Sequence, residues 1–332
     1  MTKVFPKIGM GTFGSDRYDG ATVSAAVAEA LRAGYRLFDC ASVYGNEKEI
    51  GDVFASAFAD GIVRREDVTV MSKVWNDCHG EGRIAESCKQ SLSDLGLEYL
   101  DVYFMHWPFP NYHARGCGGD SRNPDSRPFF AEEFSEAWRQ MEELKRGGYV
   151  REIAMSNMTV PKLEAVLPEC SVMPFAHEAE LHPTFQQKEL RKYCADRGII
   201  NIGFCPLGSP NRPERDRTPD DIADTGLPAI EEIARAHGCH AAEICLAWAA
   251  AEGIVPIPFA SRKENIAKNI RAADIVLTDE EKSVLSSLDC GNRLIKGQVF
   301  LWEGSDGWQD LWDVNGRLEK WKKTASGWIK AE

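Results

Sequence analysis

The chain has 332 residues and a formal net charge of -12, and hydrophobic residues make up 43% of it. This length and apolar content suffice for a globular domain with a full core, which excludes a disordered chain. A strongly negative surface repels a nucleic-acid duplex or an anionic membrane, so we expect neither as a partner.

Ten cysteines are scattered along the chain without a C-x-x-C pair or the spacing of zinc ligands. We therefore expect free thiols and no metal. The chain starts MTKVFPKIG, which has no apolar signal-peptide core, and no apolar run approaches the length of a membrane span. Together these features predict a cytoplasmic protein.

Eight short apolar runs alternate with amphipathic, charge-rich stretches. The runs, which we predict to be strands, cover residues 7–12, 35–39, 67–73, 100–106, 151–156, 174–180, 199–204 and 253–258. Predicted helices cover 21–34, 46–59, 81–95, 131–147, 160–167, 186–197, 227–251 and 263–271. Strand–helix units indicate a parallel sheet covered by helices, and eight of them predict an α/β fold of the (β/α)8 TIM barrel type.

Two segments fall outside this repeat. A long loop rich in Gly, Pro and Asp covers residues 109–130, and a tail over 291–332 holds five of the nine tryptophans. We expect a single domain over residues 1–332, with a barrel at about 7–290 and the tail over the barrel mouth. The tail tryptophans either anchor it to the outside of the barrel or line a substrate pocket, and Trp302 is the best candidate for the pocket.

Four polar side chains follow the apolar runs. Asp39 ends the second run, Lys73 the third and His106 the fourth, while Tyr44 lies just past the second. Each alone is more simply explained as a turn former, a solvated charge or a hydrogen-bonded core residue. Because barrel enzymes place their active sites at the carboxyl ends of the strands, the four together indicate catalysis.

The chemistry of these four residue types fits a proton donor beside a carbonyl group. A tyrosine has a pKa of about 10, which a neighbouring ammonium would lower. Lys73 can supply that ammonium, Asp39 can keep it charged, and His106 can orient a carbonyl. No side chain supplies a hydride, so a cofactor is implied.

Several motifs resemble those of the aldo-keto reductases. Residues 26–51 resemble the family signature, and MSKVW (71–75) and FMHWP (104–108) resemble its lysine and histidine strands. Further matches, in chain order, are MSNM (155–158), AELHP (179–183), GFCPLGS (203–209) and AEICLAWAAAEGIVPIP (242–258). The resemblance runs from about residue 7 to residue 290.

This resemblance implies a reversible, NAD(P)H-dependent reduction of an aldehyde or ketone, with sugar carbonyls among the candidates. Tyr44 would be the general acid, Lys73 and Asp39 would tune it, and His106 would orient the substrate. Ser156 and Asn157 would hold the carboxamide, Phe204 would stack on the nicotinamide, and Leu207 and Ser209 would lie under the pyrophosphate. The other expected cofactor contacts are Thr12, Glu178, Ser261, Arg262, Asn265 and Asn269, and the expected substrate contacts are Phe13, Trp75, Trp107 and Trp302.

The sequence departs from the family pattern at two cofactor positions. His177-Glu178 replaces a usual Asn-Gln, and a glutamate donates a hydrogen bond only when it is protonated. Phe259-Ala260 and Asn265 replace residues that grip the 2′-phosphate of NADP in relatives. NADP(H) is still favoured, because Arg262, Lys263 or Lys268 could take over that contact, and NAD(H) stays open.

Gly9 to Gly14 fit the dinucleotide pattern G-x-G-x-x-G, but Pro6 interrupts the approach and the next strand-end acid is Asp39. We interpret these glycines as a tight first strand and turn at the barrel mouth.

Two other functions compete with carbonyl reduction. A barrel lyase could use Lys73 to form a Schiff base, and a reductase-like regulatory subunit could bind cofactor without turnover. The complete set of four polar residues favours the enzyme, with a small-molecule carbonyl substrate. We expect it to be a monomer.

Overall fold

The computed structural model of the protein describes residues 5–113, 117, 123–208, 212–213, 216–219 and 221–331. Eight parallel strands pair in chain order: β1 (Met10–Gly11), β2 (Leu37–Asp39), β3 (Thr69–Val74), β4 (Leu100–Met105), β5 (Val150–Ser156), β6 (Ala176–Glu180), β7 (Ile200–Phe204) and β8 (Ile254–Pro256). Each lies within or overlaps one predicted apolar run, so the predicted sheet is confirmed. The Gly9 and Gly11 amides donate to the carbonyls of Pro256 (3.0 Å) and Pro258 (3.1 Å), which brings the first strand against the last.

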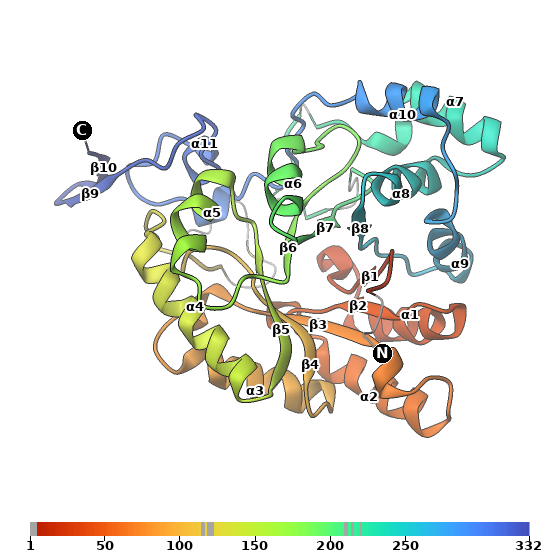
Figure 1. Cartoon of the computed structure of the whole chain (residues 1–332), viewed down its shortest axis with the longest axis horizontal. Helices are drawn as coiled ribbons and strands as arrows, with labels where there is room; N and C mark the ends of the chain where they lie inside the picture. Colours follow the sequence, from red (N-terminus) through yellow and green to blue (C-terminus); the bar gives the residue numbers. More distant parts are fainter. Residues whose placement is uncertain are drawn as a thin grey trace.

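The helices surround the strands (Figure 1). They are α1 (Gly20–Ala33), α2 (Glu47–Ala59), α3 (Arg83–Leu95), α4 (Ala131–Arg146), α5 (Val160–Val166), α6 (Lys188–Ala195), α7 (Pro228–His237), α8 (Ala241–Ala251), α9 (Lys263–Ala272), α10 (Asp279–Ser286) and α11 (Trp308–Leu311). The first begins where Asp19 accepts from the Thr22 amide, and it ends before Gly34, whose φ is 102°.

The expected helix over 227–251 is wrong, because the structure divides it into α7 and α8. Gly238 ends α7 in the left-handed conformation at φ 63°, and His240 then caps α8 together with Glu243. The sequence interpretation also missed α10, although Thr278 and Glu281 form a capping box that marks its start.

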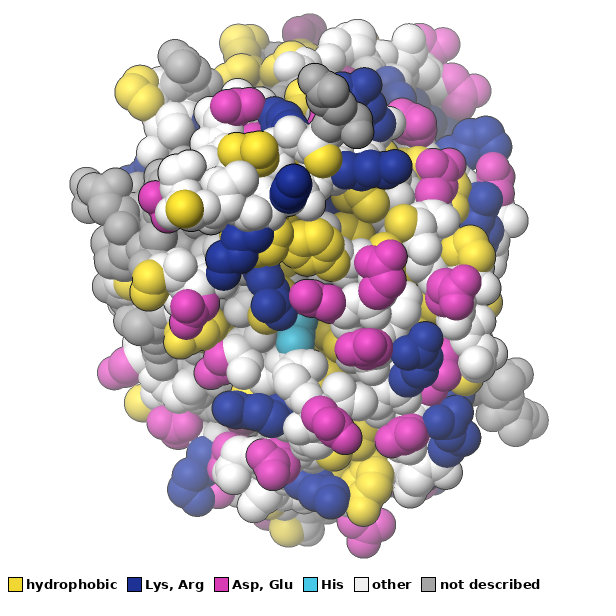
Figure 2. Space-filling model, turned by 90° about the vertical axis from the view of Figure 1, so that its left-hand side faces the viewer, with side chains coloured by type: hydrophobic (Ala, Val, Ile, Leu, Met, Phe, Trp, Pro, Cys, Tyr) yellow, Lys and Arg dark blue, Asp and Glu magenta, His cyan; other side chains and the backbone are white. Residues whose placement is uncertain are grey.

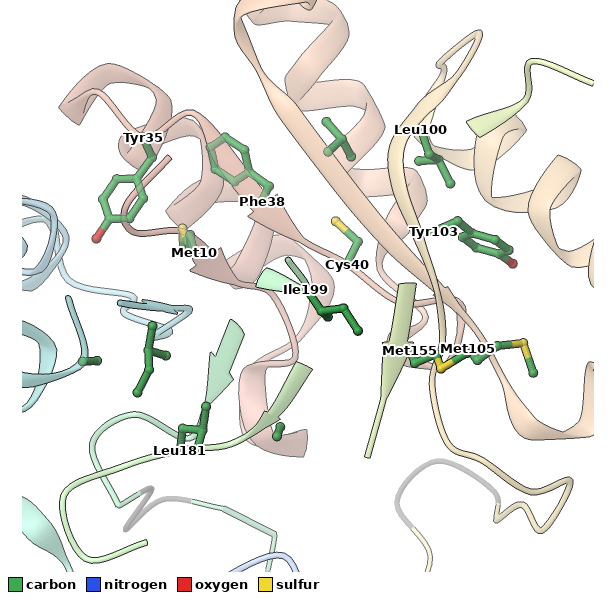
Figure 3. Packing of buried hydrophobic residues seen from close by; sticks show 14 of the residues in the cluster. Met10, Tyr35, Phe38, Cys40, Leu100, Tyr103, Met105, Met155, Leu181 and Ile199 are labelled. Carbon is green, nitrogen blue, oxygen red and sulfur yellow. The ribbon is translucent and has the colours of Figure 1, made fainter. Parts of the chain in front are cut away.

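Side chains along the strands alternate between two cores. One set faces the helices and includes Phe38, Tyr103 and Met155 (Figure 3). The other set fills the barrel interior and includes Leu37 and Met71. Because side chains two positions apart in a strand share a face, the residue two positions after each interior residue also points into the barrel.

The C-terminal tail packs on one side of the barrel mouth. Phe300 and Trp312 from the tail form an aromatic cluster with Trp75 and Trp107 from the barrel. Beyond α11, a two-stranded hairpin of β9 (Trp321–Thr324) and β10 (Gly327–Lys330) lies at the edge of the molecule (Figure 1).

The face in Figure 2 mixes acidic and basic side chains, without a broad basic patch. Within the described ranges, no helix combines the length and apolar character needed to cross a lipid bilayer. All ten cysteines lie within the described residues, and none of them forms a disulfide.

Replacing Gly11 by alanine should destabilise the barrel where β1 meets β8. An added Cβ would lie 2.9 Å from the carbonyl oxygen of Ile257, a backbone atom that cannot rotate away. We expect a loss of about 1–3 kcal/mol in the free energy of unfolding, measured by urea denaturation. Gly226→Ala is the matched control, because its Cβ would meet nothing within 4 Å. Equal stability of both variants would contradict the close approach.

Candidate active site

A cavity of about 790 Å³ opens at the carboxyl ends of the strands. One end is lined by aromatic residues that include Trp75, Trp107 and Phe300. The other end is lined by polar and charged residues that include Arg262 and Lys268. The cavity therefore has the volume of a small-molecule site and combines apolar and charged walls.

Lys73 lies fully buried beneath this cavity, at the end of β3. Its Nζ forms an ion pair with Asp39, lies 3.4 Å from Glu178 Oε1 and donates to the Cys40 carbonyl at 3.2 Å. Burial opposes the charge, but Asp39, Glu178 and Tyr44 outweigh it and hold the pKa of Lys73 above its ordinary value. The side chain is therefore an ammonium at neutral pH.

Tyr44 lies in a short 3-10 turn, Ser42–Tyr44, directly after β2. Lys73 Nζ is 5.4 Å from the centre of its ring, and the His106 ring meets it edge-on at 5.9 Å. Burial raises the pKa of Tyr44 above its ordinary value, Lys73 lowers it, and the carboxyl groups of Asp39 and Glu178 raise it again. Lys73 thus lowers the pKa of Tyr44, as expected, but burial has the larger, opposite effect. Tyr44 keeps its proton and can donate it.

His106 lies at the end of β4, with Trp75 edge-on at 5.1 Å. Burial, and next the Lys73 charge, hold the pKa of His106 well below its ordinary value. Its Nδ1 has no hydrogen-bond partner within the described part of the chain. A neutral imidazole with a free nitrogen can exchange hydrogen bonds with a ligand in the cavity.

Asn157 and Glu178 line the cavity and carry unused acceptors. The Asn157 amide donates to the His106 carbonyl at 2.9 Å and to Ser156 Oγ at 3.2 Å. Asn157 Oδ1 and Glu178 Oε2 are buried, and neither has a hydrogen-bond partner among the described residues. Because buried oxygens normally accept hydrogen bonds, the pair fits the NH2 group of a nicotinamide carboxamide.

His177, beside Glu178 on β6, has a structural role. Burial lowers the pKa of His177 to about 4, and its Nε2 accepts from the Met158 amide at 3.1 Å. This neutral ring therefore fixes the backbone next to Asn157.

The other predicted cofactor residues spread along the same cavity. Those that line it are Thr12, Phe204, Leu207, Ser261, Arg262, Asn265 and Asn269. Ser156 is buried behind Asn157, and Ser209 lies outside the described residues. Lys263 instead reaches Glu29 on α1, at 3.2 Å.

Three of the four predicted substrate residues, Phe13, Trp75 and Trp107, line the cavity, whereas Trp302 does not. Trp302 is 3% exposed and packs edge-on against Trp321 of the hairpin at 5.1 Å. The prediction that Trp302 lines the pocket is wrong, because the tail instead turns Val299 and Phe300 toward the cavity. The aromatic residues in FLWEG (300–304) correctly indicated that this segment borders the pocket, but the sequence could not show which ring faces inward.

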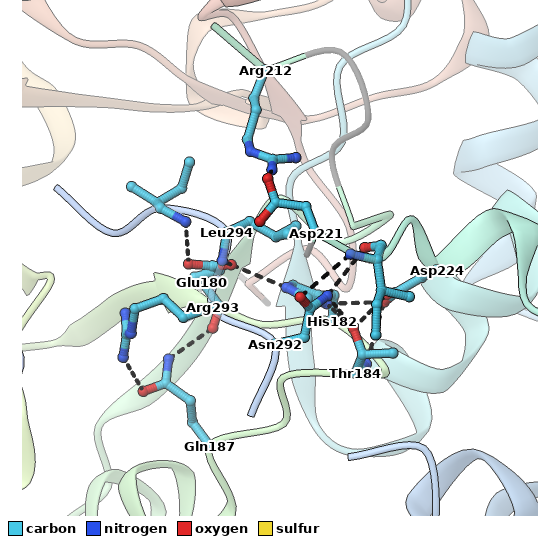
Figure 4. Close-up of polar contacts among 12 residues, drawn as sticks. Glu180, His182, Thr184, Gln187, Arg212, Asp221, Asp224, Asn292, Arg293 and Leu294 are labelled. Atoms are coloured by element: carbon cyan, nitrogen blue, oxygen red, sulfur yellow. Dashed lines mark hydrogen bonds and ion pairs between the residues drawn. The ribbon is translucent and has the colours of Figure 1, made fainter. Parts of the chain in front are cut away.

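A buried polar cluster ties the tail to the barrel (Figure 4). Glu180, at the end of β6, accepts from the backbone amides of Leu294 (2.6 Å) and Ile295 (3.0 Å). The ring of His182 lies between Glu180 (3.1 Å) and Asp224 (2.9 Å). The AELHP motif was matched in the sequence, but its role in holding the tail was not recognised. The available signal was a pair of polar residues, Glu180 at the end of the strand and His182 two positions later.

Eight parallel strands bring Tyr44, Lys73, Asp39 and His106 together at one end of the barrel. The family model for the Aldo/keto reductase family matches residues 7–289. The chain is 36% identical to an aldo/keto reductase of Synechocystis, with 93% of both chains covered. It is 35% identical to aldose reductase B of Dictyostelium discoideum, over 87% of this chain and 90% of the relative.

A solved aldose reductase from Schistosoma japonicum has the same fold, with a TM-score of 0.76 and 28% identity over 89% of this chain and 92% of the other. The chain belongs to the aldo-keto reductase family.

The charge on His182 should make stability depend on pH. Burial disfavours the imidazolium, but hydrogen bonds and charges from Asp224 and Glu180 raise the pKa of His182 to about 9. A raised pKa stabilises the fold fully below the unfolded value of about 6.5, and this stabilisation disappears as pH rises through 9. His182→Gln should therefore cost roughly 2.5 kcal/mol more at pH 6.5 than at pH 9 in urea unfolding.

The variant must be compared with the wild type at each pH, because Glu178 also has a raised pKa. This raised pKa makes both proteins less stable as the pH rises, and the comparison cancels the effect. A cost that is the same at both pH values would show that His182 is neutral in the fold.

Proposed function

We propose that this enzyme reduces an aldehyde or ketone with a nicotinamide cofactor, and that Tyr44 is the general acid. The observation that carries the proposal is the convergence of Tyr44, Lys73 and His106 beside the unused acceptors of Asn157 and Glu178. A proton donor and a carboxamide site then share one cavity.

When bound, the cofactor supplies the hydride. His106 donates a hydrogen bond that fixes the carbonyl, and Tyr44 gives its proton to the carbonyl oxygen as negative charge develops there. The Lys73 ammonium stabilises the phenolate that remains, and Asp39 holds Lys73 in place. In the reverse direction the phenolate takes the proton back from an alcohol.

Two relatives carry names that favour sugar carbonyls as substrates. They are the NADPH-dependent D-xylose reductase of Candida boidinii, 34% identical, and the D-galacturonate reductase of Fragaria ananassa, 35% identical. A sugar carbonyl beside Trp75 and Trp107 would stack its apolar face on these rings.

The surroundings of Lys73 argue against a Schiff-base lyase. A lysine must lose its proton to attack a carbonyl, but carboxyl groups keep Lys73 charged, and it does not itself line the cavity. A regulatory subunit without turnover would have no need for a proton donor held beside His106.

Tyr44→Phe should lower kcat for carbonyl reduction by about 1,000-fold or more, because the hydroxyl that donates the proton is missing. Cofactor affinity should stay within about twofold, as the ring that packs against Phe13 is retained. Single-turnover absorbance at the nicotinamide band measures the first effect and fluorescence titration the second. A kcat near that of the wild type would refute the role.

We propose further that NADPH is preferred, with Arg262 as a contact of the 2′-phosphate. Arg262 and Lys268 line the polar end of the cavity, and Arg262 directly precedes α9, whose amino terminus favours an anion. Lys263, an earlier alternative, is paired with Glu29 instead.

Arg262→Ala should raise the Kd of NADPH by about tenfold or more and leave the Kd of NADH unchanged, because only NADPH carries the extra phosphate. Lys263→Ala is the matched control next to it in the chain, and it should change neither Kd. An equal loss of affinity for NADPH and NADH in Arg262→Ala would show that Arg262 does not contact the 2′-phosphate.

A further inference from the structure

Two buried carboxyl groups, rather than one, share the Lys73 ammonium. Asp39 and Glu178 are each 2% exposed, and both contact Lys73 Nζ. If both were ionised, the buried group would carry a net negative charge. Two carboxylates that share one cation in a desolvated site resist being ionised together, so one of them tends to keep a proton.

Among the described residues, Lys73 is the cation in contact with Glu178. Asp39 faces Glu178 from β2 and Lys73 from β3, and Tyr44 and the neutral His106 lie in the same cavity wall. The neighbouring strands place Ser156 and Ile202 opposite Glu178 in the sheet register, and neither titrates near neutral pH.

Burial raises the pKa of both carboxyl groups, and because Asp39 makes the closer ion pair with Lys73, the proton falls on Glu178. Burial and the charge of Asp39 raise the pKa of Glu178 to about 8, and Lys73 offsets them only in part. The carboxyl group is therefore largely neutral at pH 7 and becomes negative as the pH rises through 8.

The unused oxygen of Glu178 belongs to the cofactor site. Its Oε2 is buried without a partner, as is Asn157 Oδ1, and both residues line the cavity. A glutamine would present the same shape but no charge. The charge state of Glu178, and with it the capacity to donate a hydrogen bond, thus distinguishes this site from one with an amide at the same position.

We propose that Glu178 makes the cofactor site select between oxidised and reduced nicotinamide in a pH-dependent way. The oxidised ring carries a positive charge, which the ionised carboxylate attracts, whereas the reduced ring is neutral and fits the protonated carboxyl. This inference rests on the proposed nicotinamide chemistry of the same site.

Binding of the oxidised cofactor then releases a proton from Glu178, and binding of the reduced cofactor does not. At low pH the site favours the reduced form and hence carbonyl reduction. At high pH it holds the oxidised form more tightly, which favours alcohol oxidation and stronger product inhibition of reduction.

The test measures Kd for NADP+ and NADPH at pH 6 and pH 9 by quenching of tryptophan fluorescence. In the wild type, the affinity for NADP+ relative to NADPH should rise by about tenfold or more across this range. The phosphates are common to both cofactors, so their titration cancels in the ratio. In Glu178→Gln the ratio should not change with pH.

Glu47→Gln is the matched control. Glu47 is a buried carboxyl with a raised pKa, caused first by burial, but it bonds Ser72 and Ser91 and does not line the cavity. In Glu47→Gln, the affinity for NADP+ relative to NADPH should change with pH as it does in the wild type. A constant ratio in the wild type, a loss in Glu47→Gln or persistence in Glu178→Gln would each overturn the inference.

Calorimetry of the wild type gives a second test that needs no variant. Titrations at pH 7.5 in buffers of different ionisation enthalpy should show proton release with NADP+ and none with NADPH. Equal proton release for both would overturn the inference even if Glu178→Gln failed to fold. Failure of the proposed function is a separate result, in which neither dinucleotide binds.

Discussion

The buried ammonium of Lys73 is the interaction on which the site depends. A charge without solvent is tolerated only where carboxyl groups and carbonyls surround it, and Asp39, Glu178 and Cys40 provide them here. The same charge counteracts the burial of the Tyr44 phenol, and together with burial, which has the larger effect, it lowers the pKa of His106. Removing Asp39 would take away the closest counter-charge of Lys73, so the stability of the barrel and the chemistry of the site depend on the same ion pair.

The barrel brings these atoms together through the alternation of side chains along its strands. Leu37 and Met71 fill the interior, and two residues later Asp39 and Lys73 stand above them on the same face. The apolar layer beneath excludes water, which strengthens every polar contact at the mouth. Small residues are needed where β1 meets β8, since a Cβ at Gly11 would strike the Ile257 carbonyl.

The tail completes the cavity by two different interactions. Glu180 binds the backbone amides of Leu294 and Ile295, and a few residues on, Phe300 packs against Trp107 with ring centres 4.5 Å apart. The polar contacts fix where the tail crosses the mouth, and the aromatic contacts give that end its apolar lining. Differences in this segment can therefore change the lining of the cavity while leaving Tyr44 and Lys73 untouched.

The sequence by itself determined the eight strand–helix units and the residues at their carboxyl ends, because apolar periodicity and strand-end position are local properties. It erred where local signals compete, as at Gly238, which splits one expected helix in two. Only the tertiary structure decided that Phe300 rather than Trp302 faces the cavity, and that burial outweighs Lys73 at Tyr44. Both depend on which atoms surround a side chain, and those atoms come from segments far apart in the chain.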